Sequence, residues 1–174
     1  MSNPPRFKDA LEVFARHDVE LIVVGGVAAV IGGAPIATFD LDVVHARGAA
    51  NLERLRAALD ELEARYRDPA GRLLRPETAA LAGPGHHLLL TRCGPVDVLG
   101  AIGCGRSYED LLPDAIAVDL GGLTVRVLRL AALIRTKEEA GRDKDRAVLE
   151  LLRAALRGST QYGRDPSVDG EKEP

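Results

Sequence analysis

A short apolar run that ends in two glycines constrains this chain more than any other feature of its 174 residues. Residues 21–24 (LIVV) are mostly β-branched and are followed by Gly25-Gly26, which predicts a buried strand that leads into a short helix over 27–31. The following positions lack the further glycines of a dinucleotide-binding fingerprint, and no G-K-[ST] phosphate loop is present. The glycine pair therefore predicts a tight turn. Such a turn either binds nothing or lets backbone N–H groups approach an anion closely.

Three aspartates are the candidate metal ligands. Asp40 and Asp42 lie in a second predicted strand over 39–44, where their alternation places both carboxylates on one face. Carboxylate oxygens are the ligands that Mg²⁺ prefers, although an acidic strand face in water produces the same pattern. Asp97 lies in the apolar segment 95–99, where an unpaired carboxylate would be costly to bury. A cation shared with Asp40 and Asp42 would satisfy all three residues, whereas an arginine partner would satisfy Asp97 alone.

The periodicity of the remaining chain predicts an α+β fold. Helices are expected over 7–16, 51–66 (with Asn51 as the N-cap), 107–112 and 130–156, the last with a break near Gly141. Hairpins are expected over 87–100 and 115–128, and a long loop over 68–85. This order predicts a mixed sheet covered by helices and followed by a C-terminal helical segment.

The length fits one domain. We expect a single domain over 1–157, with its sheet core in 19–128 and its C-terminal helices in 129–157. Residues 158–174 are poor in apolar side chains, which predicts a disordered tail.

Composition excludes several classes of protein. The chain has 23 basic and 26 acidic residues, which argues against a general electrostatic nucleic-acid binder. No apolar run approaches the ~18 residues of a membrane span, and no signal peptide is evident. Cys93 and Cys104 are too few for a disulfide framework. The sequence therefore predicts reduced thiols in a cytoplasmic protein without a membrane partner.

Basic residues gather near the C-terminus. Segment 126–146 holds seven basic and four acidic residues. Lys137, Gly141 and Lys144 have the spacing of one helix face, and the small Gly141 would leave room for a phosphate there. A solvated helix face has the same pattern, so the segment does not establish a binding role by itself.

The combined pattern resembles a known superfamily. An apolar strand, Gly25-Gly26, thirteen further residues, the segment 40–43 (DLDV) and a later strand with Asp97 resemble the signature of DNA polymerase β-like nucleotidyltransferases. Segments 37–42 (ATFDLD) and 127–145 also resemble the small branch that contains AbiEii-type and MenT-type toxins. The resemblance extends over about residues 19–156.

This resemblance implies a nucleotidyltransferase-like mixed sheet and a Mg²⁺-dependent transfer of a nucleoside monophosphate from an NTP to an acceptor hydroxyl. In the toxin branch the acceptor would be the 3′ end of tRNA, and the protein would be paired with a cognate antitoxin. A protein hydroxyl, as for AMPylating antitoxins, a small antibiotic, and a catalytically silent nucleotide-binding module stay open as alternatives. The nucleotide preference and the oligomeric state are not predicted.

The resemblance also implies roles for individual residues. Two Mg²⁺ ions would be held by Asp40, Asp42 and Asp97, and catalysis would further involve Lys137 and Asp145. The nucleotide would contact Gly25, Gly26, Thr38, Lys137 and Arg142. Thr38 would also be a site of regulatory phosphorylation by a partner antitoxin.

Overall fold

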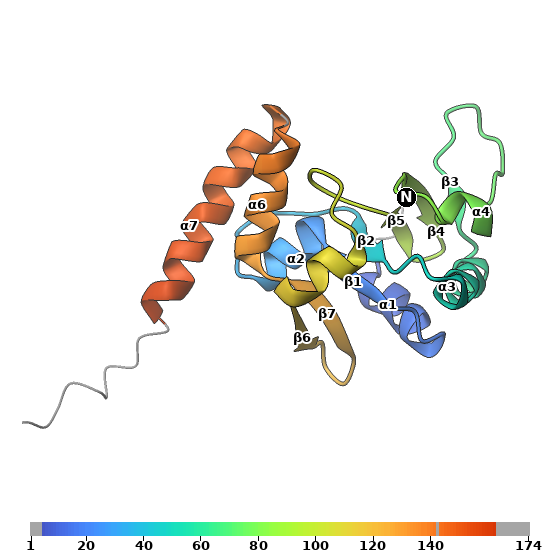
Figure 1. Cartoon of the computed structure of the whole chain (residues 1–174), viewed down its shortest axis with the longest axis horizontal. Helices are drawn as coiled ribbons and strands as arrows, with labels where there is room; N and C mark the ends of the chain where they lie inside the picture. The colour runs from blue at the N-terminus through green and yellow to red at the C-terminus, as the bar shows by residue number, and fades with distance from the viewer. Residues whose placement is uncertain (1–4, 142, 163–174) are drawn as a thin grey trace, which may run out of the picture.

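The computed structural model describes residues 5–141 and 143–162 (Figure 1). The helices are α1 (Phe7–Arg16), α2 (Gly25–Ile31), α3 (Ala49–Glu61), α4 (Thr78–Leu81), α5 (Tyr108–Leu111), α6 (Leu130–Ala140) and α7 (Arg146–Tyr162). The strands are β1 (Leu21–Val24), β2 (Leu41–His45), β3 (Arg65–Tyr66), β4 (His86–Thr91), β5 (Gly94–Leu99), β6 (Ala115–Asp119) and β7 (Thr124–Leu128). Two short 3₁₀ turns are η1 (Leu112–Asp114) and η2 (Asp143–Asp145).

In the described residues, seven strands form one mixed sheet in the order β3-β4-β5-β2-β1-β7-β6. β1 pairs antiparallel with β2 and parallel with β7, and β2 pairs parallel with β5. The strands at the centre of the sheet are the most buried, and Ile22, Val23, Val43 and Val98 are fully buried. The predicted α+β fold with a mixed sheet and a C-terminal helical segment is confirmed.

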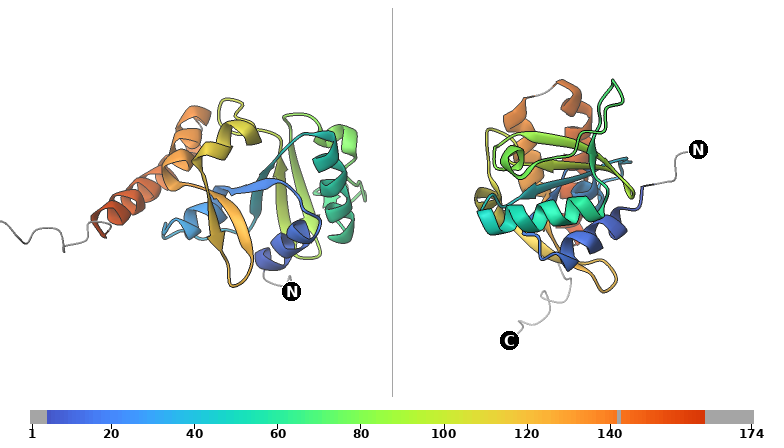
Figure 2. Two further views of the ribbon diagram at one scale, coloured as in Figure 1. Left: turned by 60° about the horizontal axis from the view of Figure 1, so that its bottom comes forward. Right: turned by 90° about the vertical axis from the view of Figure 1, so that its right-hand side faces the viewer.

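The helices pack around this sheet in two groups. α1 and α3 contact each other and lie side by side in the right-hand view of Figure 2. α2 packs on β1, β2 and α6, and α6 packs on α7. α6 and α7 lie at one end of the molecule and α3 and α4 at the other (Figure 1). Within the described ranges, no helix combines the length and apolarity needed to cross a membrane.

The helix predicted over 51–66 is two elements. α3 ends at Glu61, and Glu63 adopts a left-handed backbone conformation with φ 55°, which stops the helix. Residues 65–66 then form β3, which pairs with β4. The predicted N-cap is also wrong, since Gly48 caps α3 and Asn51 lies inside its first turn. The Asn51 side chain instead bonds to the backbone of Glu20 and Ala46.

The predicted break in the C-terminal helix is confirmed. Gly141 has φ 60° and caps α6 in the left-handed conformation that glycine adopts without strain. α7 then continues to Tyr162, so residues 158–162 are helical, where the tail was expected to begin. Residues 163–174 of the predicted tail and the predicted nucleotide ligand Arg142 lie outside the described residues.

Candidate active site

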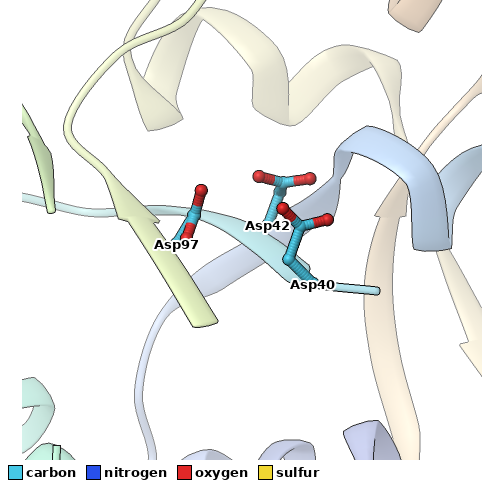
Figure 3. A group of neighbouring side chains, drawn as sticks. All are labelled: Asp40, Asp42 and Asp97. Carbon is cyan, nitrogen blue, oxygen red and sulfur yellow. The ribbon is translucent and has the colours of Figure 1, made fainter. Parts of the chain in front are cut away.

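The pairing of β1, β2 and β5 brings two of the three predicted acids side by side. Asp42 is paired with Val24 on β1 and with Asp97 on β5. A carboxylate oxygen from each of Asp40, Asp42 and Asp97 lies within 4.8 Å of the others. Figure 3 shows that the carboxylates of Asp42 on β2, Asp97 on β5 and Asp40 just before β2 project into one common space. The structure therefore assembles the acidic group that the sequence pattern predicted.

Asp40 reaches this group by a different route from the predicted one. β2 begins at Leu41, so Asp40 lies in the bend before the strand and strand alternation does not orient its side chain. Phe39, in the same bend, is 75% exposed. The Thr38 hydroxyl donates to the Asp40 backbone oxygen at 3.1 Å and lies 3.3 Å from its Oδ1. Thr38 and Asp40 are therefore neighbours through a turn, not through a strand.

Residues 25 and 26 have to be glycine because other side chains occupy the space that a Cβ atom would need. Gly25 has φ 62°, and a Cβ atom at this position would lie 1.9 Å from Asp42 Oδ2. A Cβ atom at Gly26 would lie 2.4 Å from Thr38 Oγ1. The helix α2 starts at Gly25, two residues earlier than predicted, and the backbone of Gly26 hydrogen-bonds to Asp42. Because neither glycine has a side chain, Asp42 can pack against Gly25 and Thr38 can pack against Gly26.

Asp42 and Asp97 are in an unfavourable environment for negative charge. Burial raises the pKa of Asp42 to about 7, with further increases from Asp40 and Asp97, while Gly26 and Lys137 oppose the shift. Burial also raises the pKa of Asp97, where the ion pair with Arg67 opposes it. A cation between the three carboxylates would remove this repulsion. Their oxygen-only donor set fits a hard divalent cation such as Mg²⁺.

A cavity of about 680 Å³ connects the acids with the C-terminal helices. Lys137 and Asp145 line it together with the three aspartates. Lys137 Nζ donates to Asp145 Oδ1 at 2.8 Å, and this contact joins α6 to η2. The predicted helix face of Lys137 and Lys144 is wrong, because α6 ends at Ala140 and Lys144 lies in η2.

Two residues at the acids were not predicted as part of the site. Arg67 forms an ion pair with Asp97, and His86 at the start of β4 lines the cavity. His86 Nε2 lies 2.9 Å from the Ala101 backbone oxygen. Arg67 is 30 residues from Asp97 in the chain and belongs to no periodic segment. Only the pairing of β3 with β4, and of β4 with β5, brings them together.

Comparison with solved structures agrees with the fold of this chain. A protein from Thermotoga maritima, provisionally described as a nucleotidyltransferase, superposes with a TM-score of 0.55 at 16% identity, covering 87% of this chain and 91% of that one. The antibiotic-resistance factor ANT(2″)-Ia gives a TM-score of 0.49 at 15% identity, with 90% and 91% of the two chains covered. The first of these two superpositions shows that the chain has a nucleotidyltransferase-like fold.

No protein-family model matches the sequence. No curated protein matches it either.

Proposed function

We propose that this protein is a Mg²⁺-dependent nucleotidyltransferase that moves a nucleoside monophosphate from an NTP to an acceptor hydroxyl. The observation that carries the proposal is the group of Asp40, Asp42 and Asp97, whose carboxylate oxygens lie within 4.8 Å of one another. The group lines a cavity of about 680 Å³. A catalytically silent module would not need three mutually repelling carboxylates at a cavity, since such a cluster costs folding free energy unless a cation balances it.

The residues suggest how the reaction would proceed. The acceptor oxygen forms a bond to the α-phosphorus of the NTP. The bond between the α-phosphorus and the oxygen that bridges it to the β-phosphorus breaks, and pyrophosphate leaves with that electron pair. Asp97 accepts the proton of the acceptor hydroxyl as the general base. When bound, two divalent cations at the acids supply charge that polarises the attacking oxygen and stabilises the leaving group.

The other cavity residues would hold the triphosphate. Gly25 and Gly26 let Asp42 and Thr38 pack against the start of α2, and we propose that the triphosphate contacts the backbone of this turn. Lys137 supplies a positive charge to the phosphates, and Asp145, at 2.8 Å from its Nζ, orients it. Arg142 is two residues beyond α6 in the chain, and we propose it as a further phosphate ligand.

A labelling experiment tests the activity and identifies the acceptor. Purified protein is incubated with Mg²⁺ and each α-³²P-labelled NTP in turn, together with total tRNA, cell protein or an aminoglycoside. We expect label on the tRNA 3′ end, as the resemblance to the toxin branch implies. An Asp40→Ala variant is expected to transfer no label.

Each other outcome has a definite meaning. Label on a protein would show the AMPylating type of activity, and label on the aminoglycoside would show an antibiotic-modifying enzyme. Equal labelling by wild type and Asp40→Ala would contradict the role of the acids. The absence of label on every acceptor would favour the silent nucleotide-binding module.

We also propose that a cognate antitoxin regulates the site by phosphorylating Thr38. The Thr38 hydroxyl lies 3.3 Å from Asp40 Oδ1, so a phosphate on it would place a charge of about −1.5 to −2 beside the acids and repel the triphosphate. Intact-mass and peptide analysis after co-expression with the partner is expected to find one phosphate on Thr38 and less transfer activity. Unmodified Thr38 in an inhibited complex would contradict this mode of regulation.

A further inference from the structure

Arg67 lies at the end of a row of residues that crosses the sheet. Its backbone N–H donates to the Leu88 oxygen at 3.0 Å, Leu88 is paired with Asp97, and Asp97 is paired with Asp42. To form its ion pair with Asp97, the guanidinium must extend across the position of Leu88. This arrangement places the permanently charged guanidinium of Arg67 in contact with Asp97, one of the three clustered acids.

The two cations near the acids differ in their partners. Lys137 is paired with Asp145, which is not one of the three clustered acids. Arg67 is paired with Asp97, which is one of them. The Asp97 side chain is 11% exposed and that of Arg67 is 35% exposed, so solvent screens this pair only in part. A divalent cation coordinated by Asp97 would lie close to the Arg67 guanidinium and would be repelled by it.

We propose that Arg67 is an internal counter-ion that neutralises Asp97 while the site holds no metal and is displaced from Asp97 when a divalent cation binds. The proposal rests on the proposed function, since it takes the three acids as the metal ligands. In this role Arg67 reduces the repulsion between the carboxylates of the empty site. It also weakens metal binding, because the ion pair must break before Asp97 is available. Arg67 therefore acts on the metal site through Asp97 and is not itself a metal ligand.

Metal affinity tests the proposal directly. Binding of Mn²⁺ at pH 8, followed by the electron paramagnetic resonance signal of the free ion, is compared in wild type, Arg67→Gln, Arg67→Lys and Arg65→Gln. Arg65 is the matched control, because it is two residues away and its side chain forms no ion pair within the described part of the chain. We expect Arg67→Gln to bind Mn²⁺ about five- to tenfold more tightly than wild type. Arg65→Gln and Arg67→Lys are expected to stay within about twofold of wild type.

A second measurement does not depend on any variant folding normally. In ¹⁵N-labelled wild type, the Nε–Hε signal of Arg67, assigned by its absence from the Arg67→Gln spectrum or by triple-resonance experiments, is followed during a Mg²⁺ titration. Displacement predicts that this signal shifts toward that of a solvated arginine and saturates with the metal. An unshifted signal at saturating Mg²⁺, or equal Mn²⁺ affinities of Arg67→Gln and Arg65→Gln, would overturn the displacement.

The outcomes separate this proposal from the proposed function. Mn²⁺ binding that Asp42→Asn abolishes and Arg67→Gln leaves unchanged would overturn the role of Arg67 alone. If neither wild type nor Arg67→Gln binds Mn²⁺, the metal site itself is wrong and Arg67 is a permanent partner of Asp97.

Discussion

Replacing Asp42 with asparagine is expected to lower nucleotidyl transfer by at least about 10³-fold, because the variant loses the charge that holds both cations. Asparagine has the same shape and its amide oxygen can still accept the hydrogen bond from the Gly26 backbone. The loss should therefore be one of chemistry and not of folding. Single-turnover transfer of labelled nucleotide measures it, with Asp9→Asn in α1 as the matched control.

The same variant is expected to be more stable than wild type when metal is absent. The pKa of Asp42 is raised from 3.8 to about 7, so the folded protein binds this proton more tightly than the unfolded chain. The free energy of unfolding of metal-free wild type therefore falls as the pH rises through this range, and the contribution is lost above pH 7. At pH 8, Asp42→Asn should exceed wild type by about 2–4 kcal/mol.

Thermal denaturation in EDTA between pH 5.5 and 8.5 checks this expectation. Wild type should lose stability toward high pH and regain it with Mg²⁺, while Asp42→Asn should show a weaker dependence on both. A variant that keeps transfer within tenfold of wild type would contradict the assignment of Asp42. A variant that follows the pH dependence of wild type would contradict the argument about its pKa.

Replacing Gly25 with alanine is expected to disable the site through contact and not through backbone strain alone. The new Cβ atom would lie 1.9 Å from Asp42 Oδ2, so the carboxylate has to leave its position. We expect a loss of at least about 10²-fold in transfer and about 2–4 kcal/mol in the free energy of unfolding. Transfer kinetics and denaturant unfolding measure the two effects.

Gly33→Ala is the matched control for this prediction. Gly33 has φ 89°, so alanine is strained there as it is at Gly25, but no atom lies within 4 Å of the added Cβ. Its cost should be only the left-handed backbone penalty of about 1–2 kcal/mol, with transfer unchanged. Equal losses in the two variants would show that the turn matters and the contact with Asp42 does not.

Local signals in the sequence were sufficient for much of the fold. The strand at residues 21–24, both hairpins and the break at Gly141 follow from apolar runs and turn residues that lie within a few positions of one another. The end of α3 was missed because the apolar period continues past Glu61. The left-handed conformation of Glu63 and the pairing of β3 with β4 decide that boundary.

The sequence by itself determined which residues are candidates for chemistry at this site. Neither the Gly25-Gly26 pair nor the Asp40 and Asp42 pair is specific alone. Both were identified because, combined with the later acid, they resemble the nucleotidyltransferase signature. Asp97 was identified because an isolated acid in an apolar strand needs a partner.

Only the tertiary structure decided how these residues are arranged. The parallel pairing of β2 with β5 places Asp97 beside Asp42, and the β3–β4–β5 pairing brings Arg67 to Asp97. These contacts join residues 30 or more positions apart in the chain. No local pattern encodes such a contact, because strand neighbours and register depend on how the whole sheet buries its apolar side chains.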